Sequence, residues 1–215
     1  MKKTIFITGA TSGIGKATAE IFAKQGHRLI ICGRRKEVLD NLQIQLSNFT
    51  DVYSLVFDVR NQQEVQNAIN SLPEDWKNID VLVNNAGNAH GLEPISDANI
   101  SDWDAMMDGN VKGLLYVSQP IIKLMKANNS GHIVNISSVA ARQTYANGTV
   151  YCASKKAVDV ISEGMRLELT EFGIKVTNVQ PGAVETDFSK VRFKGDEERA
   201  ATVYAGYEPL IAEDI

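Results

Sequence analysis

The stretch Thr4-Ile5-Phe6-Ile7-Thr8-Gly9-Ala10-Thr11-Ser12-Gly13-Ile14-Gly15 decides the fold. It predicts a short strand at 4–7, a glycine-rich turn, and then a helix. Glycines permit left-handed dihedrals and let a ligand approach the backbone, and a helix start offers unpaired N–H donors and a positive dipole end. We therefore expect the turn to bind phosphate. Its spacing is G-x-x-x-G-x-G rather than G-x-G-x-x-G, and a tight turn that binds nothing is the alternative.

Strand and helix patterns alternate along the rest of the chain. We predict strands at 28–32, 52–57, 80–83, 131–136 and 174–179, and helices at 38–46, 65–72, from about 101 past Pro120, and 151–172. Strands that alternate with helices indicate βαβ units and a parallel sheet. We predict an α/β fold: a Rossmann-type, doubly wound parallel β-sheet with helices on both faces, in one domain spanning 1–215. Pro120 predicts a kink or local break.

Composition and charge narrow the class of protein. The 215 residues are 44% hydrophobic and 22% charged, which is typical of a globular domain. The net charge of −4 argues against a nucleic-acid or membrane partner, and no apolar run approaches the ~20 residues that span a bilayer. Cys32 and Cys152 lie far apart without a secretory signal, so we expect reduced thiols and a cytoplasmic protein. His27, His90 and His132 lack metal-ligand spacing, so we expect no metal site.

Two arginines follow the second predicted strand. An NAD-binding unit usually carries an acid about 20 residues past its glycine turn, for the ribose 2′-hydroxyl. Arg34 and Arg35 stand there instead, and a guanidinium suits a 2′-phosphate. The pair favours NADP over NAD. The alternative is a solvated basic pair that opens the next helix.

Tyr151 and Lys155 lie four residues apart at the start of a long helical pattern. Residues at i and i+4 share a helix face, and a nearby cation lowers the pKa of a phenol. A tyrosine tuned in this way can exchange a proton with a carbonyl or an alcohol. The alternative is a chance spacing on a solvated helix. Asn110, polar among apolar neighbours, needs hydrogen-bond partners inside the protein.

From Thr4 to about Thr186 the chain resembles the short-chain dehydrogenase/reductase family. The motifs are Thr8-Gly9-x-x-x-Gly13-Ile14-Gly15, Asn84-Asn85-Ala86-Gly87, Asn110, Ser138, Tyr151-x-x-x-Lys155 and Pro181-Gly182. The resemblance implies that Tyr151 gives or takes the proton and that Ser138 hydrogen-bonds the reacting oxygen. It also implies that Lys155 lowers the tyrosine pKa and holds the nicotinamide ribose, while Asn110 keeps a water in a relay toward Lys155.

The same resemblance implies the contacts with NADP. They are Gly9, Thr11, Ser12, Gly13, Ile14 and Gly15 at the pyrophosphate; Asp58 and Val59 at the adenine; Asn85, Ala86 and Gly87 at the ribose; and Pro181, Gly182, Val184 and Thr186 at the nicotinamide. NADP-dependent members often have a basic residue just before the second glycine. Ser12 stands there, so the preference for NADP rests on Arg34 and Arg35.

The substrate is a separate prediction. Val191-Arg192-Phe193-Lys194-Gly195-Asp196, Leu92-Glu93-Pro94 and Asp58-Val59-Arg60-Asn61 resemble the branch that oxidises 3-hydroxy acids. Its substrates include serine, allo-threonine and 3-hydroxyisobutyrate, and in reverse it reduces semialdehydes such as malonic semialdehyde. We expect Arg192 to bind the substrate carboxylate; a surface arginine on a lid is the alternative. Gln143 and Tyr145 are expected to line the pocket, although packing also explains Tyr145.

Other functions remain open at this point. Within enzymes, the alternatives are a reductase of 3-oxoacyl thioesters and a general carbonyl reductase. A non-catalytic NADP-binding sensor on the same fold would be expected to have lost some of the tyrosine, lysine, serine and asparagine, and all four are present. A nucleic-acid-binding protein is disfavoured by the acidic charge.

Family members continue into a further helix and a last parallel strand, which flank the substrate pocket and form much of the tetramer contact. This sequence stops at Ile215, so we expect both elements to be missing. We expect 185–215 to be a mobile substrate lid and, from the resemblance alone, a homotetramer. An uncovered edge strand tends to pair with other chains, so we expect this span alone to be poorly stable or poorly active.

Overall fold

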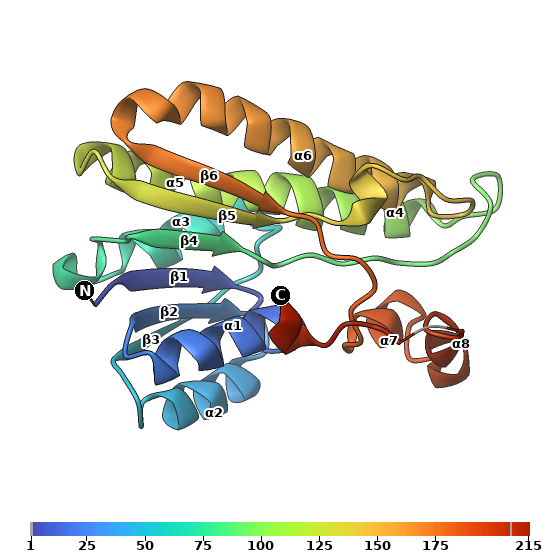
Figure 1. Ribbon diagram of the computed structural model, residues 1–215, viewed down its shortest axis with the longest axis horizontal. Helices are drawn as coiled ribbons and strands as arrows, with labels where there is room; N and C mark the ends of the chain where they lie inside the picture. The colour runs from blue at the N-terminus through green and yellow to red at the C-terminus, as the bar shows by residue number, and fades with distance from the viewer. Residues whose placement is uncertain (1, 207) are drawn as a thin grey trace.

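The structure is a computed structural model, and it describes residues 2–206 and 208–215. Its centre is a six-stranded sheet in the order β3-β2-β1-β4-β5-β6, with every pairing parallel (Figure 1). The strands are β1 (Thr4–Thr8), β2 (Arg28–Gly33), β3 (Val52–Val56), β4 (Val81–Asn84), β5 (Gly131–Ile136) and β6 (Ile174–Val179). The predicted doubly wound parallel sheet is confirmed.

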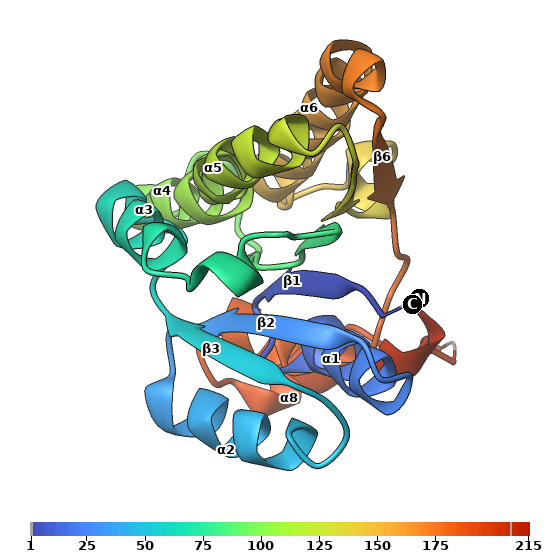
Figure 2. The same ribbon diagram turned by 90° about the vertical axis from the view of Figure 1, so that its left-hand side faces the viewer.

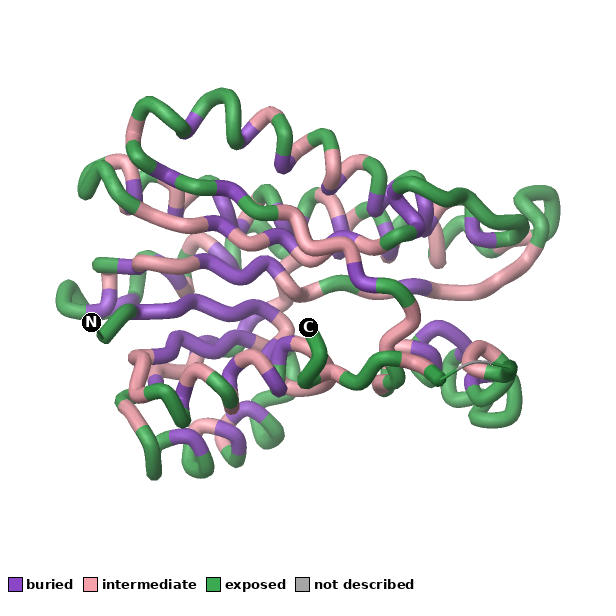
Figure 3. Tube along the Cα trace, viewed as in Figure 1, coloured by how far each residue is buried: buried purple, intermediate pink, exposed green. Residues whose placement is uncertain are grey.

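Helices cover both faces of the sheet, as Figure 2 shows. The helices α1 (Gly13–Lys24) and α2 (Lys36–Leu46) bury one face; α3 (Gln62–Asn70), α5 (Gly113–Ala127) and α6 (Thr149–Leu169) bury the other, and α4 (Ile100–Met107) packs on α6. All five residues of β1 are buried (Figure 3), because a central parallel strand has a helix layer on each side. Two apolar clusters result, one on each face.

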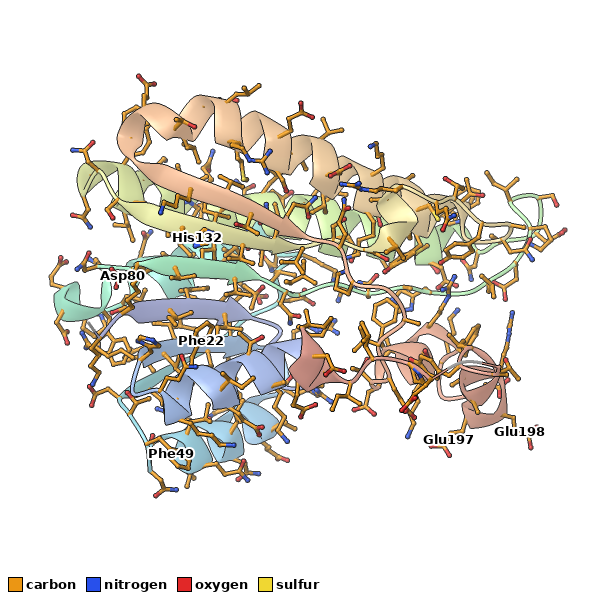
Figure 4. The ribbon with its side chains drawn as sticks, in the orientation of Figure 1. Phe22, Phe49, Asp80, His132, Glu197 and Glu198 are labelled. Carbon is orange, nitrogen blue, oxygen red and sulfur yellow. The ribbon has the colours of Figure 1, made fainter. Side chains whose placement is uncertain are left out.

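All six strands point their carboxyl ends toward the side where α7 (Phe188–Arg192) and α8 (Glu197–Thr202) lie (Figure 1). Ligands of open α/β sheets bind at this edge. Asp80 and His132 lie at the opposite edge, where β4 and β5 begin, and Glu197 and Glu198 mark the far end of the molecule on α8 (Figure 4).

The segment after β6 contains two short helices. It forms α7 and α8 and then returns toward the sheet, where Leu210 pairs with Val184 in a single parallel bridge. Ala212–Asp214 form a 3₁₀ turn next to α1. Along β6, at the edge of the sheet, Lys175 and Thr177 are exposed.

Two details of the helices differ from expectation or sharpen it. Pro120 does not break the helix: α5 continues through it, and the irregular turn is a π-helical segment at Asp108–Lys112, before α5 begins. The helix that carries Tyr151 ends as predicted, with a 3₁₀ turn at Thr170–Phe172 followed by Gly173 at φ 67°. A side chain at Gly173 would also meet the carbonyl oxygen of Asn129 at 2.7 Å.

No helix within residues 2–206 and 208–215 combines the length and the apolar character needed to cross a bilayer.

Candidate active site

One large cleft at the carboxyl edge of the sheet contains nearly every predicted site residue. Its volume is about 1080 Å³, enough for a dinucleotide and a small substrate. The predicted residues that line it are Gly9, Thr11, Ser12, Gly13, Ile14, Arg34, Arg35, Asp58, Val59, Asn85, Ala86, Gly87, Ser138, Gln143, Tyr145, Tyr151, Lys155, Pro181, Gly182, Val184, Thr186 and Arg192. Gly15 and Asn110 lie behind its wall.

The glycine turn joins β1 to α1 with two residues in the left-handed region, Gly9 at φ 65° and Gly13 at φ 51°. Ser12 is extended and does not cap α1 with its side chain, so the first N–H groups of the helix are left for a ligand. Gly15 is buried beneath the turn, where a Cβ atom would overlap the Gly9 carbonyl oxygen and the Asn85 amide. It allows close packing and does not line the cleft.

Asn85 braces the glycine turn from β4. Its Nδ2 donates to the carbonyl oxygens of Thr8 (2.9 Å) and Gly9 (3.1 Å), and its own N–H and that of Ala86 donate to Thr8 Oγ1 at 3.0 and 2.9 Å. The Asn85 side chain, expected at the ribose, is therefore bonded to the protein. Thr8 was given no role from the sequence, although this threonine ties the glycine turn after β1 to the turn after β4.

The predicted 2′-phosphate site lies at the end of β2. Arg35 donates to the carbonyl oxygen (3.2 Å) and Oγ1 (2.9 Å) of Thr11, and the exposed Arg34 lies 3.4 Å from an Asp58 carboxylate oxygen. Arg60 grips the same carboxylate, with Nη2 at 2.7 Å. Burial opposes ionisation of Asp58, but the hydrogen bonds from Arg60 and the charge of Arg34 hold its pKa below the usual value.

Tyr151 and Lys155 share one face of α6, as predicted, and both are buried, with 8% and 6% of their surface exposed. The Lys155 ammonium lies 6.0 Å from the centre of the Tyr151 ring and donates to the Ile136 carbonyl oxygen at 3.0 Å. Ser138 comes from the end of β5, and its hydroxyl favours the ionised form of the Tyr151 phenol, which lowers the pKa of that group. The Ser138 Oγ also accepts from the Ala140 N–H at 3.1 Å. The structure thus brings all three groups to one wall of the cleft.

The expectation that Lys155 lowers the phenol pKa is not borne out for the protein by itself. Burial raises the pKa of Tyr151 to about 12, and the hydrogen bond from Ser138 and the charge of Arg192 offset only part of this effect. Burial also lowers the pKa of Lys155 to about 8. Desolvation disfavours both charged forms, and it is the largest cause of the pKa shift for each group.

Asn110 occupies the π-helical turn before α5, a feature frequent at functional sites. Asn110 has hydrogen-bond partners inside the protein, as predicted. Its Oδ1 accepts from the Asn88 N–H (2.7 Å), and its Nδ2 donates to the Asn88 carbonyl oxygen (2.8 Å) and Ser154 Oγ (2.9 Å). The side chain is therefore hydrogen-bonded to the protein, and its oxygen and the Lys155 ammonium both lie close to Gly87.

The substrate end of the cleft is closed by α7. Arg192 is buried, with 9% of its surface exposed; its Nε donates to the Gly91 carbonyl oxygen and its Nη1 to the Tyr145 hydroxyl, both at 3.0 Å. Its guanidinium carbon lies 5.6 Å from the centre of the Tyr151 ring. No acid among the described residues pairs with it in the way that Asp102 pairs with Lys194. Gln143 lines the cleft and is exposed.

Some site residues were missed by sequence reasoning. Phe188 has its ring centre 5.9 Å from that of Tyr151, and Gly91 contacts Arg192 through both its N–H and its carbonyl oxygen. Arg60 stood in a quoted stretch but was given no role. Neither Phe188, at the start of α7, nor Gly91 carries a local signal of its partner, because each contact joins segments about 40 to 100 residues apart.

The comparisons with known proteins show the family of the chain. A family profile described as short chain dehydrogenase matches residues 3–197. The NADP-dependent 3-hydroxy acid dehydrogenase YdfG of Salmonella typhi is 43% identical over 98% of this chain and 85% of its own length. Sulfoacetaldehyde reductase 2 of Chromohalobacter salexigens is 41% identical over 100% of this chain and 86% of its own. The closed form of a serine dehydrogenase complexed with NADP+ superposes with a TM-score of 0.93, at 42% identity over 98% and 85% of the two chains.

The buried Lys155 predicts a pH dependence of stability. Its pKa falls from 10.5 to about 8 on folding, so the unfolded chain binds more protons between these values and stability rises with pH there. Raising the pH from 7.5 to 9.5 relieves roughly 2 kcal/mol of the free-energy cost of burying the Lys155 ammonium. Urea unfolding at pH 7.5 and 9.5, without added nucleotide, should therefore show the wild type gaining about this much relative to Lys155→Met. Parallel changes in the two proteins would mean that Lys155 is not desolvated.

Proposed function

Because this chain belongs to the short-chain dehydrogenase family, we propose that it transfers a hydride between NADP and the hydroxyl carbon of a small 3-hydroxy acid. It is an NADP-dependent oxidoreductase that acts on CH–OH groups. The proposed substrates are of the serine, allo-threonine or 3-hydroxyisobutyrate type, with a semialdehyde such as malonic semialdehyde in the reverse direction. The names of two relatives, a 3-hydroxy acid dehydrogenase and a serine dehydrogenase, support this class.

The observation that carries the substrate proposal is the buried guanidinium of Arg192 beside Tyr151. A buried charge is costly unless it is paired, and within the described residues only two neutral oxygens accept hydrogen bonds from it. Its Nη2 has no acceptor there. A substrate carboxylate would supply both the missing charge and the missing acceptors. The reacting hydroxyl would then lie at Tyr151, a few bonds from the carboxylate.

The lining of the cleft fits NADP. The N–H groups at the start of α1 would hold the pyrophosphate, and Arg34 and Arg35 would take the 2′-phosphate. Asp58 and Val59 would flank the adenine, and Pro181, Gly182, Val184 and Thr186 would face the nicotinamide. When bound, NADP supplies the hydride donor or acceptor and, in its oxidised ring, a positive charge beside the phenol.

Proton transfer would be carried out by side chains of the protein. Tyr151 would take a proton from the alcohol or give one to the carbonyl oxygen, and Ser138 would hydrogen-bond that oxygen as its charge develops. Because the phenol pKa is raised in the protein by itself, the phenolate must gain stabilisation from positive charge that is present in the assembled site. Lys155 would hold the nicotinamide ribose. We propose that Asn110 fixes the wall behind Lys155, and that a water relay would start from its main chain.

A sulfonate aldehyde is a second candidate substrate, favoured by the resemblance to sulfoacetaldehyde reductase 2. A guanidinium can donate hydrogen bonds to a sulfonate as well as to a carboxylate, so Arg192 could bind either group. Comparing kcat/KM for malonic semialdehyde and sulfoacetaldehyde separates the two candidates. A 3-oxoacyl thioester or an uncharged ketone would leave Arg192 without its anion, which disfavours those alternatives. A non-catalytic sensor would not need the wall that Ser138, Tyr151 and Lys155 form.

The assignment of Arg35 predicts a change in cofactor preference. Removing a hydrogen bond to a charged group costs about 1.5–3 kcal/mol, or roughly 10- to 100-fold in binding. Arg35→Ala should therefore raise the KM for NADPH by that factor and leave the KM for NADH nearly unchanged. Lys36→Ala, which removes a neighbouring charge paired with Asp40, is the control. Equal losses with both cofactors would remove Arg35 from the 2′-phosphate site.

The role of Arg192 predicts a loss confined to anionic substrates. The probes are 3-hydroxyisobutyrate and its methyl ester, which share the reacting carbon and differ in charge. Arg192→Ala should lower kcat/KM for the acid roughly 100-fold, because the anion loses a bidentate partner, and should affect the ester far less. Lys190→Ala on the same helix, where the lysine pairs with Glu197, should leave the ratio of acid to ester unchanged. Equal losses for acid and ester would contradict the carboxylate role.

A further inference from the structure

Arg192 reaches the catalytic tyrosine from α7, a different part of the chain from the helix that carries Tyr151. Its side chain has four rotatable bonds, and each ordered rotamer costs entropy. If the guanidinium is to bind the substrate anion and so fix the position of the reacting hydroxyl, it must be held in one place. Two oxygens hold it: the Gly91 carbonyl oxygen accepts from Nε and the Tyr145 hydroxyl accepts from Nη1, both at 3.0 Å.

The two contacts differ in what they connect. Gly91 and Arg192 also share a backbone bond, from the Gly91 N–H to the Arg192 carbonyl oxygen at 3.0 Å. This pair therefore fixes α7 against the segment after β4. Tyr145 lies six residues before Tyr151, in the tight turn that leads into α6. Its hydroxyl ties Arg192 by a hydrogen bond to the turn that precedes the helix of Tyr151.

The ring of Tyr145 packs against Gly148 at the start of α6. Gly148 precedes the helix and is buried, and a Cβ atom there would overlap the ring, with Cζ at 2.5 Å and Cδ2 at 2.7 Å. The turn is closed by the Gly148 N–H, which donates to the Tyr145 carbonyl oxygen at 3.3 Å, and by Asn147 in the left-handed region at φ 65°. The ring thus lies directly on the backbone that begins the Tyr151 helix.

The Arg192 guanidinium also lies over this ring, with its carbon 5.5 Å from the ring centre. The Tyr145 hydroxyl accepts from Nη1 and leaves Nη2 without an acceptor among the described residues. Tyr145 therefore holds the guanidinium from one side and leaves donors free for an anion.

We propose that Tyr145 is a specificity-determining positioning residue, which acts through Arg192, and that Gly148 is the small residue that gives its ring room. Tyr145 sets the distance between the bound anion and the Tyr151 phenol. This role rests on the proposed function, since it requires Arg192 to bind the substrate anion. It differs from pocket lining because the effect passes through a second side chain.

Tyr145→Phe should lower kcat/KM for 3-hydroxyisobutyrate about 10-fold, mainly through KM, because the guanidinium loses one of its two fixed acceptors. The ratio of acid to methyl ester should fall by nearly the same factor. Gly148→Ala displaces the ring and should lower this ratio in the same direction. Tyr116→Phe, on α5 and remote from α7, is the matched control and should leave the ratio unchanged.

The double variant Tyr145→Phe/Arg192→Ala separates positioning from direct contact. Once Arg192 is absent, loss of the Tyr145 hydroxyl should cost less than 2-fold for the acid. A further 10-fold loss in this background, or equal losses for acid and ester in Tyr145→Phe alone, would overturn the proposal. If Arg192→Ala itself lowers acid and ester equally, the carboxylate role fails and the Tyr145 role fails with it. If Arg192→Ala discriminates and Tyr145→Phe does not, only the Tyr145 role fails.

Discussion

The site depends on a phenol and an ammonium group that are both buried on one face of α6. Burial keeps Tyr151 protonated and makes Lys155 easier to deprotonate, so neither group carries its charge without cost in the protein by itself. Positive charge beside the phenol, from an oxidised nicotinamide, would offset the cost of the phenolate. In the proposed mechanism, proton exchange at Tyr151 is thereby coupled to the assembled site. This coupling, rather than a lysine acting alone, would let a tyrosine with a raised pKa serve as an acid and a base.

The fold supplies this arrangement through turns that brace one another at the carboxyl edge of the sheet. Thr8 and Asn85 connect the ends of β1 and β4, so the phosphate-side turn and the ribose-side turn form one unit. The end of the cleft near Arg192 is built differently. Lys194, just after α7, pairs with Asp102 of α4 at 3.0 Å, and Arg199 of α8 pairs with Glu93 in the segment after β4 at 3.2 Å. Most residues expected to bind the cofactor follow the ends of strands, whereas Gln143 and Tyr145, which are expected to line the substrate pocket, lie on a connecting segment, where sequences vary most.

Local patterns carried most of the prediction. The alternation of strands and helices gave the parallel sheet because each pattern is short and regular, and Gly173 marked the end of α6 because a left-handed residue was needed there. Local patterns failed where distant segments decide the outcome. The raised pKa of Tyr151 reflects the whole wall of the cleft. The irregular turn lies at Asn110 rather than at Pro120, and the Asn110 side chain there hydrogen-bonds Asn88 and Ser154. The contact of Arg192 with Tyr145 spans 47 positions and leaves no trace in either local sequence.

The most direct test of this account is Tyr151→Phe, assayed for oxidation of 3-hydroxyisobutyrate and, in the same preparation, for binding of NADPH by fluorescence titration. The ring remains to pack against Phe188, while the proton-exchanging oxygen is removed. We expect kcat to fall by at least about 100-fold and the Kd for NADPH to change by less than about 3-fold. Undiminished turnover by the variant would contradict the account.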